Sequence, residues 1–418
     1  MKATWEMKKL GEICEERKEK NIKSLDLPVY AVSNIWGFVL SEEYFNKRVY
    51  SESLRNYKLV YKNDFAYNPA RVNVGSIGLY KNNEPGLVSP MYIVFTIKER
   101  EALEPDFLYY LFKTDFYKNK IKDLASSQGS IRQVLKLDDL FNLEVPTPPL
   151  PIQQKIVRIL DTIQEAIDIQ EKIIEKTNEL KKSLMAELFK YGAPSFRKGR
   201  KLKKTEIGEI PEDWEVVRLG EICEIVYGVQ ASVSELKEET GRIPILTNKN
   251  ITDEGTIDLT NLNFYPENLI DSKKHLLKKG DIIFNWRSGS IEHVGKSALF
   301  NLEGKFTFAS FLLRFRPKPN VTNSYFLNSY LNKIRKEGFL KFFAHQASIN
   351  QSLNASISSN IPIPLPTLSE QREIAEILQT IDQKIEIEKR KKELYEELFK
   401  TMLNKIMNQE IDVEKIEV

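Results

Sequence analysis

The sequence has few of the residues from which disulfide frameworks and metal sites are built. Its 418 residues include two cysteines, Cys14 and Cys223, and three histidines, His275, His293 and His345. A disulfide framework needs more cysteines, so we expect both thiols to be small buried hydrophobic groups. The histidines lack the paired spacing of zinc ligands, so we expect no metal site.

Long apolar runs and catalytic motifs are also missing. No apolar stretch approaches the length needed to cross a bilayer, and residues 1–9 are polar and charged, so we expect a cytoplasmic protein with no membrane partner. No glycine-rich loop ends in the Gly-Lys-Ser/Thr of a phosphate site. Asn68-Pro69-Ala70-Arg71 lacks the second proline and the aromatic ring of the adenine methyltransferase motif. We therefore predict a chain without catalytic activity of its own.

Charge is nearly balanced over the whole chain. Lysine and arginine number 62 against 59 aspartate and glutamate, which gives a net charge of +3. This excess is too small to predict nucleic-acid binding by overall attraction, so any basic surface must be local. The strongest basic cluster is the run 197–204, which fits either a solvated linker or a strap that contacts phosphates.

The chain contains two copies of one unit. Residues 10–15 and 219–224 share the sequence Leu-Gly-Glu-Ile-Cys-Glu. Residues 128–133 (Gln-Gly-Ser-Ile-Arg-Gln) correspond to 346–351 (Gln-Ala-Ser-Ile-Asn-Gln), 218 positions later. A proline-rich junction, followed each time by a helix-like pattern, recurs at the same spacing. This ordered duplication predicts an α+β fold with two similar mixed α/β domains, each followed by a long helix.

Each helix-like segment has the pattern of a coiled coil. Glycine and proline are absent from 152–191 and from 369 onward, and the preceding prolines suit a helix's first turn. Apolar residues recur at three-and-four spacing, interrupted by polar residues that would help to fix a register. The alternative is that each helix is an amphipathic surface of its own domain. The predicted helix-pair seam consists of Ile156, Leu160, Ile163, Ile167, Ile174, Leu184, Ile374, Leu378, Ile381, Ile385, Tyr395 and Met402.

The linker length favours antiparallel packing of the two helices. A helix over 152–190 would be about 58 Å long. Parallel packing would make the linker 193–212 span that distance, close to its full extension of about 66 Å. Antiparallel helices need no such stretch and give a pseudo-twofold repeat. The predicted organisation is a first globular domain (1–145), a spacer helix (146–192), a basic linker (193–212), a second globular domain (213–362), a second spacer helix (363–408) and a C-terminal tail (409–418).

In these features the chain resembles the specificity (S) subunits of type I restriction-modification systems. The resemblance covers residues 5–408 and rests on the duplication, on the segment 206–216 that leads into the second copy, on the two Gln-x-Ser-Ile-x-Gln strings and on the junctions ending at 150–154 and 368–372. The first copy begins at Trp5 without the fuller lead-in of the second, so the edge of its domain is less well defined.

The resemblance implies a division of labour between this chain and its partners. Two target-recognition domains would each read one half of a bipartite, asymmetric site in double-stranded DNA. The helices would space the halves and dock two methyltransferase (M) subunits and the restriction/translocase (R) subunits. S-adenosylmethionine, ATP and Mg would belong to those partners, with no cofactor in this chain.

Two loops per domain are candidates for DNA contact. Arginine can bond guanine bidentately, asparagine can bond adenine, and both can hold phosphates. The alternative is that these are turn residues that cap a strand. Two domains that read different half-sites should differ where they read bases, which favours Arg132 and Asn350 as base readers. The candidates are Asn68, Arg71, Asn73, Gln128, Ser130, Arg132 and Gln133 in the first copy, and Asn285, Arg287, Ser288, Ser290, Gln346, Ser348, Asn350 and Gln351 in the second.

Two other classes of function compete with this hypothesis. A duplicated protein-protein scaffold would bind partners without sequence-specific DNA binding, but it leaves the glutamine-serine loops without a use. A self-contained modification enzyme would need a cofactor loop that the sequence does not contain.

Overall fold

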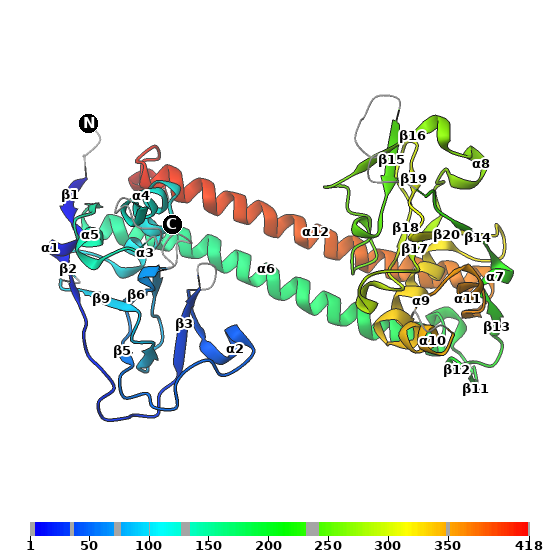
Figure 1. The fold of residues 1–418 in the computed structure, drawn as a ribbon, viewed down its shortest axis with the longest axis horizontal. Coiled ribbons are helices and arrows are strands. Elements are labelled where there is room, and N and C mark those ends of the chain that lie inside the picture. Colours follow the sequence, from blue (N-terminus) through cyan, green and yellow to red (C-terminus); the bar gives the residue numbers. More distant parts are fainter. Residues whose placement is uncertain are drawn as a thin grey trace. The chain divides into compact units, whose positions relative to one another are not determined.

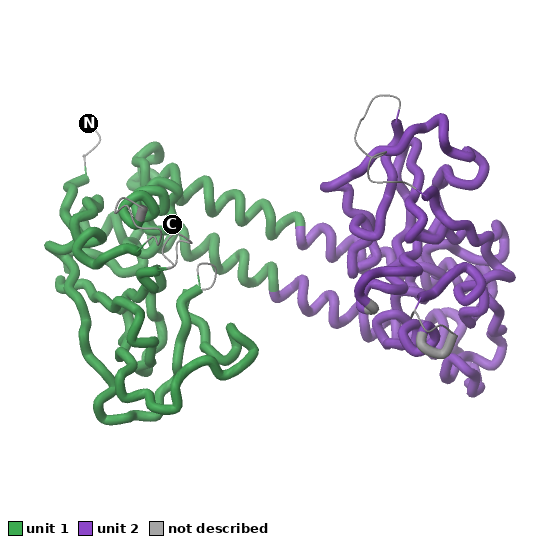
Figure 2. The backbone as a smooth tube through the Cα atoms, in the orientation of Figure 1, with its two compact units in different colours: residues 1–171, 390–418 green, residues 172–389 purple. Residues whose placement is uncertain are grey.

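The structure is a computed structural model that describes residues 5–33, 37–70, 77–99, 101–126, 134–230, 242–347 and 352–416 (Figure 1). These residues form two compact units (Figure 2). Unit 1 comprises residues 1–171 and 390–418, and unit 2 comprises residues 172–389. No helix within the described ranges is long and apolar enough to span a membrane.

Unit 1 is built on two small sheets. The strand β9 (Ile93–Ile97, Ile-Val-Phe-Thr-Ile) is rich in β-branched and aromatic residues, which favour the extended backbone. It lies inside an antiparallel sheet ordered β2 (Cys14–Glu16), β9, β6 (Phe65–Tyr67), β7 (Ile77–Leu79). The second sheet is ordered β4 (Gly37–Leu40), β3 (Val29–Ser33), β8 (Gly86–Val88), β5 (Lys58–Val60), with β3 and β8 parallel. A separate pair joins β1 (Glu6–Lys9) to β10 (Glu144–Thr147).

Unit 2 repeats this topology, which confirms the predicted duplication. Its antiparallel sheet is ordered β14 (Cys223–Tyr227), β20 (Leu312–Pro317), β17 (Ile282–Asn285), β18 (Ser297–Leu299). The second sheet is ordered β16 (Asn263–Pro266), β15 (Arg242–Leu246), β19 (Thr307–Phe308), again with one parallel pair, β15 with β19. The pair β13 (Glu215–Arg218) and β21 (Pro362–Leu365) corresponds to β1 and β10.

Short helices surround the sheets of each unit. In unit 1 they are α1 (Leu10–Ile13), α2 (Ser41–Phe45), α3 (Pro105–Lys113), α4 (Asp115–Ser126) and α5 (Leu137–Phe141). In unit 2 they are α7 (Leu219–Ile222), α8 (Ser272–His275), α9 (Ser324–Lys336), α10 (Phe339–Ala347) and α11 (Ala355–Ser359), with the 3-10 turns η2 (Pro194–Phe196), η4 (Asn248–Asn250), η5 (Glu267–Leu269) and η6 (Ile291–His293). Asn323 caps α9 by accepting from the N–H groups of Tyr325 and Phe326, which α9's own carbonyls leave unpaired.

Two long helices, α6 (Leu150–Tyr191) and α12 (Leu368–Met407), each contribute to both units. In unit 1, Lys392 pairs with Glu171 at 3.1 Å, while Lys155 donates to the Glu414 carbonyl at 3.1 Å. The residue further along α6, Glu171, is paired with the residue that comes earlier in the C-terminal segment, Lys392. The two chain segments therefore run in opposite directions. In unit 2, Lys181 pairs with Asp382 and the Ala193 N–H with Glu370, in the same sense. Antiparallel packing is therefore confirmed within each unit.

The helices begin later than the predicted boundaries at 146 and 363. Residues 144–147 and 362–365 are strands, because each pairs with the first strand of its own copy before the chain enters the helix. None of the twelve predicted seam residues is exposed. Ile156 and Leu160 lie in the core of unit 1, and Ile374 and Leu378 lie in the core of unit 2, each 0% exposed.

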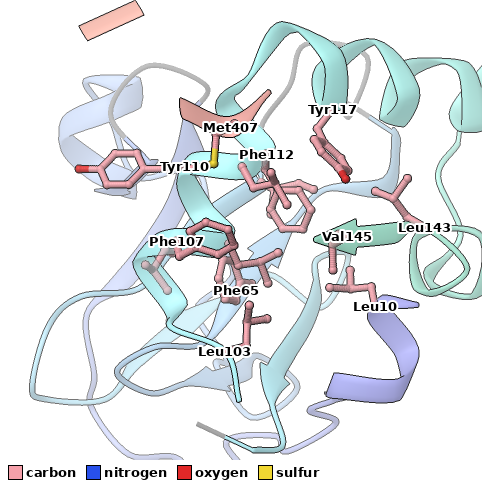
Figure 3. Packing of buried hydrophobic residues seen from close by; sticks show 14 of the residues in the cluster. Leu10, Phe65, Leu103, Phe107, Tyr110, Phe112, Tyr117, Leu143, Val145 and Met407 are labelled. Atoms are coloured by element: carbon pink, nitrogen blue, oxygen red, sulfur yellow. The ribbon is translucent and has the colours of Figure 1, made fainter. Parts of the chain in front are cut away.

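The core of unit 1 joins the sheet, α3 and both long helices. Phe65 on β6 stacks on Phe95 on β9 at 5.1 Å, and α3 adds Phe107 and Phe112 (Figure 3). Met407 from α12 lies in the same cluster. The predicted C-terminal tail (409–418) also contributes here, because Val413 in η7 (Val413–Lys415) is buried in this core.

The predicted basic linker is instead a folded part of unit 2. Residues 202–205 and 208–211 pair as the hairpin β11 (Leu202–Thr205) and β12 (Gly208–Pro211). Arg200 forms an ion pair with the fully buried Glu370 on α12 and another with Asp213 at 2.6 Å. The indole N–H of Trp214 also donates to Glu370, at 3.0 Å. Because a buried carboxylate needs such partners, the linker is held against the start of α12.

Both cysteines are buried, as predicted, and neither forms a disulfide. Burial raises the pKa of the Cys14 thiol and of the Cys223 thiol to about 12. Each therefore stays protonated near neutral pH and behaves as a packing group.

One glutamine side chain in each copy connects the globular part to its long helix. Gln153 on α6 is 0% exposed. Its side-chain NH2 group donates to the carbonyls of Pro148 at 2.7 Å and Ala102 at 2.9 Å. Its side-chain oxygen accepts from the Glu104 N–H at 2.8 Å. Gln371 on α12 repeats this pattern with Pro366, Val321 and Asn323. The recurring glutamine of the sequence is thus a structural bracket.

We predict that Gln153→Ala lowers the free energy of unfolding by about 3 kcal/mol, because backbone groups that it satisfies would be left unpaired inside the protein. Urea denaturation of the full chain measures this. Gln154→Ala is the matched control, since Gln154 is exposed on the same helix turn. Equal effects of the two variants would contradict a role for the bracket.

Candidate nucleic-acid interface

In each copy, a residue shortly after the glutamine-serine string is hydrogen-bonded to the loop that follows the strand β6 or β17. In unit 1, the N–H of Leu135, just after the glutamine-serine loop, donates to the Pro69 carbonyl in the loop after β6, at 3.1 Å. In unit 2, the N–H of Leu353 donates to the Trp286 carbonyl after β17, at 2.9 Å. Leu135 and Leu353 are each 0% exposed, so buried side chains anchor both junctions.

Several predicted contact residues fall outside the described residues. They are Arg71, Asn73, Gln128, Ser130, Arg132, Gln133, Ser348, Asn350 and Gln351, together with the side chain of Gln346. The predicted contact residues that the structure does describe are Asn68, Asn285, Arg287, Ser288 and Ser290.

A buried aspartate holds the strand that leads to the first loop in each copy. Asp64 accepts from the Tyr61 N–H at 2.8 Å and pairs with Arg17 at 2.8 Å. Asp281 accepts from the Lys278 N–H at 2.7 Å and pairs with Arg316 at 2.7 Å. Burial raises the pKa of the Asp64 carboxyl, because removal from water disfavours its charge more than its partners restore it.

An asparagine at the end of each strand, Asn285 as the last residue of β17 and Asn68 just after β6, bonds to its own loop. Asn285 is 0% exposed, and its amide donates to the His293 carbonyl at 2.9 Å. In this structure its amide is therefore turned into its own loop, whereas its residue type had predicted a DNA contact. Asn68 is half-buried, and its side-chain oxygen accepts from the Ala70 N–H at 3.0 Å. Both therefore behave as turn residues, the alternative left open by the sequence.

Arg287 is an accessible charged side chain in the post-strand loop of unit 2. It is exposed, and within the described part of the chain it forms no ion pair or hydrogen bond. By contrast, Lys296 and Arg335 both pair with Asp253, at 3.0 and 2.6 Å. Ser290 is also exposed and Ser288 is half-buried.

An aromatic pair supports the backbone beside Arg287. The indole N–H of Trp286 donates to the Ser310 carbonyl at 2.8 Å, and its ring meets the edge of Tyr227 at 5.5 Å. The Tyr227 hydroxyl accepts from the Ala355 N–H at 2.9 Å. Trp286 thus fixes the post-strand loop to the turn before β20 and to the segment after the glutamine-serine loop.

The turns that precede β9 and β20 were not among the contact sites predicted from the sequence. Residues 89–92 in unit 1 and 309–312 in unit 2 are matching turns, and each exposes one large apolar side chain, Met91 or Phe311. The strand pairings place these turns 220 positions apart, so an alignment at the 218 spacing does not bring them together.

Comparison with known proteins matches both copies to one family. The family described as "Type I restriction modification DNA specificity domain" matches residues 2–179 and 211–397. The type I restriction enzyme MjaVIII specificity subunit of Methanocaldococcus jannaschii is 27% identical over 99% of this chain and 94% of its own length. The StySPI specificity subunit of Salmonella potsdam is 32% identical over 42% of this chain and 37% of its own.

A solved structure shares the fold over nearly the whole chain. The type I restriction-modification S subunit from M. genitalium superposes with a TM-score of 0.58 at 17% identity, covering 96% of each chain. The family matches extend over most of both copies. The chain therefore belongs to the type I restriction-modification DNA specificity family, as its duplicated sequence indicated.

Proposed function

We propose that this chain is the non-catalytic specificity subunit of a type I restriction-modification complex, and that each copy reads one half of a bipartite, asymmetric DNA site. One observation carries the proposal: in both copies a backbone hydrogen bond joins the post-strand loop to the end of the glutamine-serine loop, at Pro69 and at Trp286. Two polar loops at one end of a sheet suit the recognition of base edges and phosphates.

The reactions of the complex belong to its partners in this proposal. Methyl transfer would use S-adenosylmethionine on two methyltransferase subunits, and ATP-dependent cleavage with Mg would take place on the restriction subunits. This chain would supply the sequence reading and the docking surfaces. The proposal rests on the family membership and on the missing phosphate loop of the sequence.

The long helices would act as a spacer with a coiled-coil seam. Four polar residues interrupt the apolar pattern. Gln170, Thr177 and Glu388 are buried, at 6 to 8% exposure, and Lys392 is half-buried and pairs with Glu171. Polar groups enclosed in a helical seam favour one register over its alternatives. Such a register would hold the length of the gap between the half-sites constant.

Exposed apolar residues at matching helix positions support two equivalent docking surfaces. Ile169 on α6 is 57% exposed and Ile387 on α12 is 55% exposed, and they are 218 residues apart. Leu180 and Leu398, also 218 apart, are 51% and 44% exposed. The same side chains are thus available once in each copy, as two M subunits would require.

We predict that Ile169→Glu weakens binding of one M subunit at least tenfold, because a charge replaces an apolar side chain at the interface. Ile387→Glu should affect the second M subunit in the same way. Native mass spectrometry of the assembled complex counts the subunits. Lys172→Glu, an exposed change on the same helix, is the control, and unaltered stoichiometry in both isoleucine variants would count against these surfaces.

Arg287 gives a direct test of base reading. We predict that Arg287→Ala costs about 1 to 3 kcal/mol of binding and relaxes specificity in one half-site, because a bidentate base contact would be lost. Sequencing of methylated DNA from cells that express the chain with its M subunit reports the motif. Asn285→Ala should instead lower thermal stability, since that side chain is buried. Equal loss on all sequences would make Arg287 a phosphate contact.

Exchange of residues 213–362 for those of another family member tests modularity. A split methylated motif that changes in one half only is the expected result. A complex that assembles and methylates no defined motif would favour the protein scaffold and contradict the proposed function.

A further inference from the structure

Each copy exposes one large apolar side chain at the same point of its fold. Met91 is 69% exposed and Phe311 is 50% exposed. Each occupies the third position of a tight turn, closed by the Tyr92 N–H to the Ser89 carbonyl at 3.0 Å and by the Leu312 N–H to the Ala309 carbonyl at 2.9 Å. The central strands β9 and β20 follow these turns, so the two positions are structurally equivalent.

The turn lies at the same end of the sheet as the loops proposed to read DNA. Tyr67, the last residue of β6, faces Ile93 across the sheet, and Asn285, the last residue of β17, faces Leu312. In unit 2 the contact is direct, because the Trp286 indole donates to the Ser310 carbonyl at 2.8 Å. Phe311 therefore directly follows Ser310, whose carbonyl is hydrogen-bonded to the post-strand loop.

Packing does not account for these side chains. Neither Met91 nor Phe311 belongs to a hydrophobic cluster of its unit, whereas the next residues do: Tyr92 packs against one cluster and Leu312 is buried in another. A lone exposed apolar residue is ordinary on a protein surface. The same exposure at the same turn in both copies, beside the same loop, calls for a function of that turn.

We infer that Met91 and Phe311 each contact the methyl group of a thymine in the major groove, one in each half-site. The inference rests on the proposed function and names a further specificity-determining residue for each copy. Among the four bases only thymine presents a methyl group there, and apolar side chains are its usual contacts. In unit 2, Arg287 and Ser290 of the neighbouring loop would supply hydrogen bonds to the DNA, and an apolar side chain would add a contact with the thymine methyl group that they cannot make.

The identities of the two residues fit this role. The fold needs no particular side chain at an exposed turn position, yet both copies keep a large apolar one. The copies differ in which one, methionine or phenylalanine, as domains that read different sequences should. The isolation of each side chain also suits a base better than a protein partner, because the core of a protein interface gathers several apolar residues.

The test compares methylated motifs in cells that express the full chain with its M subunit. Phe311→Ala should make one A·T position of one half-site degenerate and reduce methylation of the original motif about tenfold, the usual scale of one lost base-pair preference. Met91→Ala should do the same in the other half-site only. Leu269→Ala and Ile22→Ala are matched controls, since these residues are 56% and 65% exposed elsewhere in the two units.

A second measurement uses the purified complex and synthetic DNA. Replacing thymine with deoxyuridine at the relaxed position removes only the methyl group, so it should weaken binding by the wild-type complex and leave binding by the Phe311→Ala complex unchanged.

An unchanged motif in both variants, or relaxation at a G·C pair, would overturn the inference while leaving the proposed function intact. Weaker M-subunit assembly, with the remaining methylation still at the unchanged motif, would identify the turn as a protein contact and overturn it too. If the wild-type complex methylates no split motif, the proposed function fails together with the inference.

Discussion

The structure depends on a hydrogen-bonded bracket made twice by a glutamine at the start of a long helix. Gln153 and Gln371 each bond the proline carbonyl at the base of the helix and two backbone groups of the globular domain. A buried amide satisfied on all sides has one acceptable orientation, because rotation would leave polar groups unpaired. The direction in which each helix leaves its domain is therefore set by hydrogen bonding as well as by apolar packing.

The burial of the central strands explains where the proposed binding surface lies. The strands β6, β9, β17 and β20 are almost entirely buried, so their faces are used for packing and only their ends remain for function. Buried aspartates, Asp64 and Asp281, fix the approach to those ends through paired arginines. A loop at the end of such a strand is held at its base by a rigid scaffold, which is the arrangement that many binding sites share.

The features of the fold that could be predicted from the sequence are those that rest on a repeat or on a periodic pattern. The duplication, the long helices and their antiparallel sense followed from matched strings, from the lack of glycine and proline, and from the length of the linker. The linker's own structure could not be predicted, because Arg200 finds Glu370 at a distance of 170 residues along the chain. Asn285 shows the same limit at the site: its residue type suits base recognition, and only the fold reveals that its amide is turned inward to His293.

The two copies also show how a duplicated chain can read two sequences. Three features are common to both copies: the glutamine bracket, the buried aspartate before the strand (Asp64 or Asp281) and the backbone hydrogen bond at the base of the loops. All three hold the backbone in place. One difference lies at an exposed tip, where Met91 of unit 1 corresponds to Phe311 of unit 2. Another lies in the support, where Pro69 of unit 1 corresponds to Trp286 of unit 2, which packs on Tyr227. A change at a tip costs little stability because nothing packs on it, whereas a change at the support would unfold the loop that presents it. Specificity can therefore diverge between the copies without any change to the scaffold that holds it.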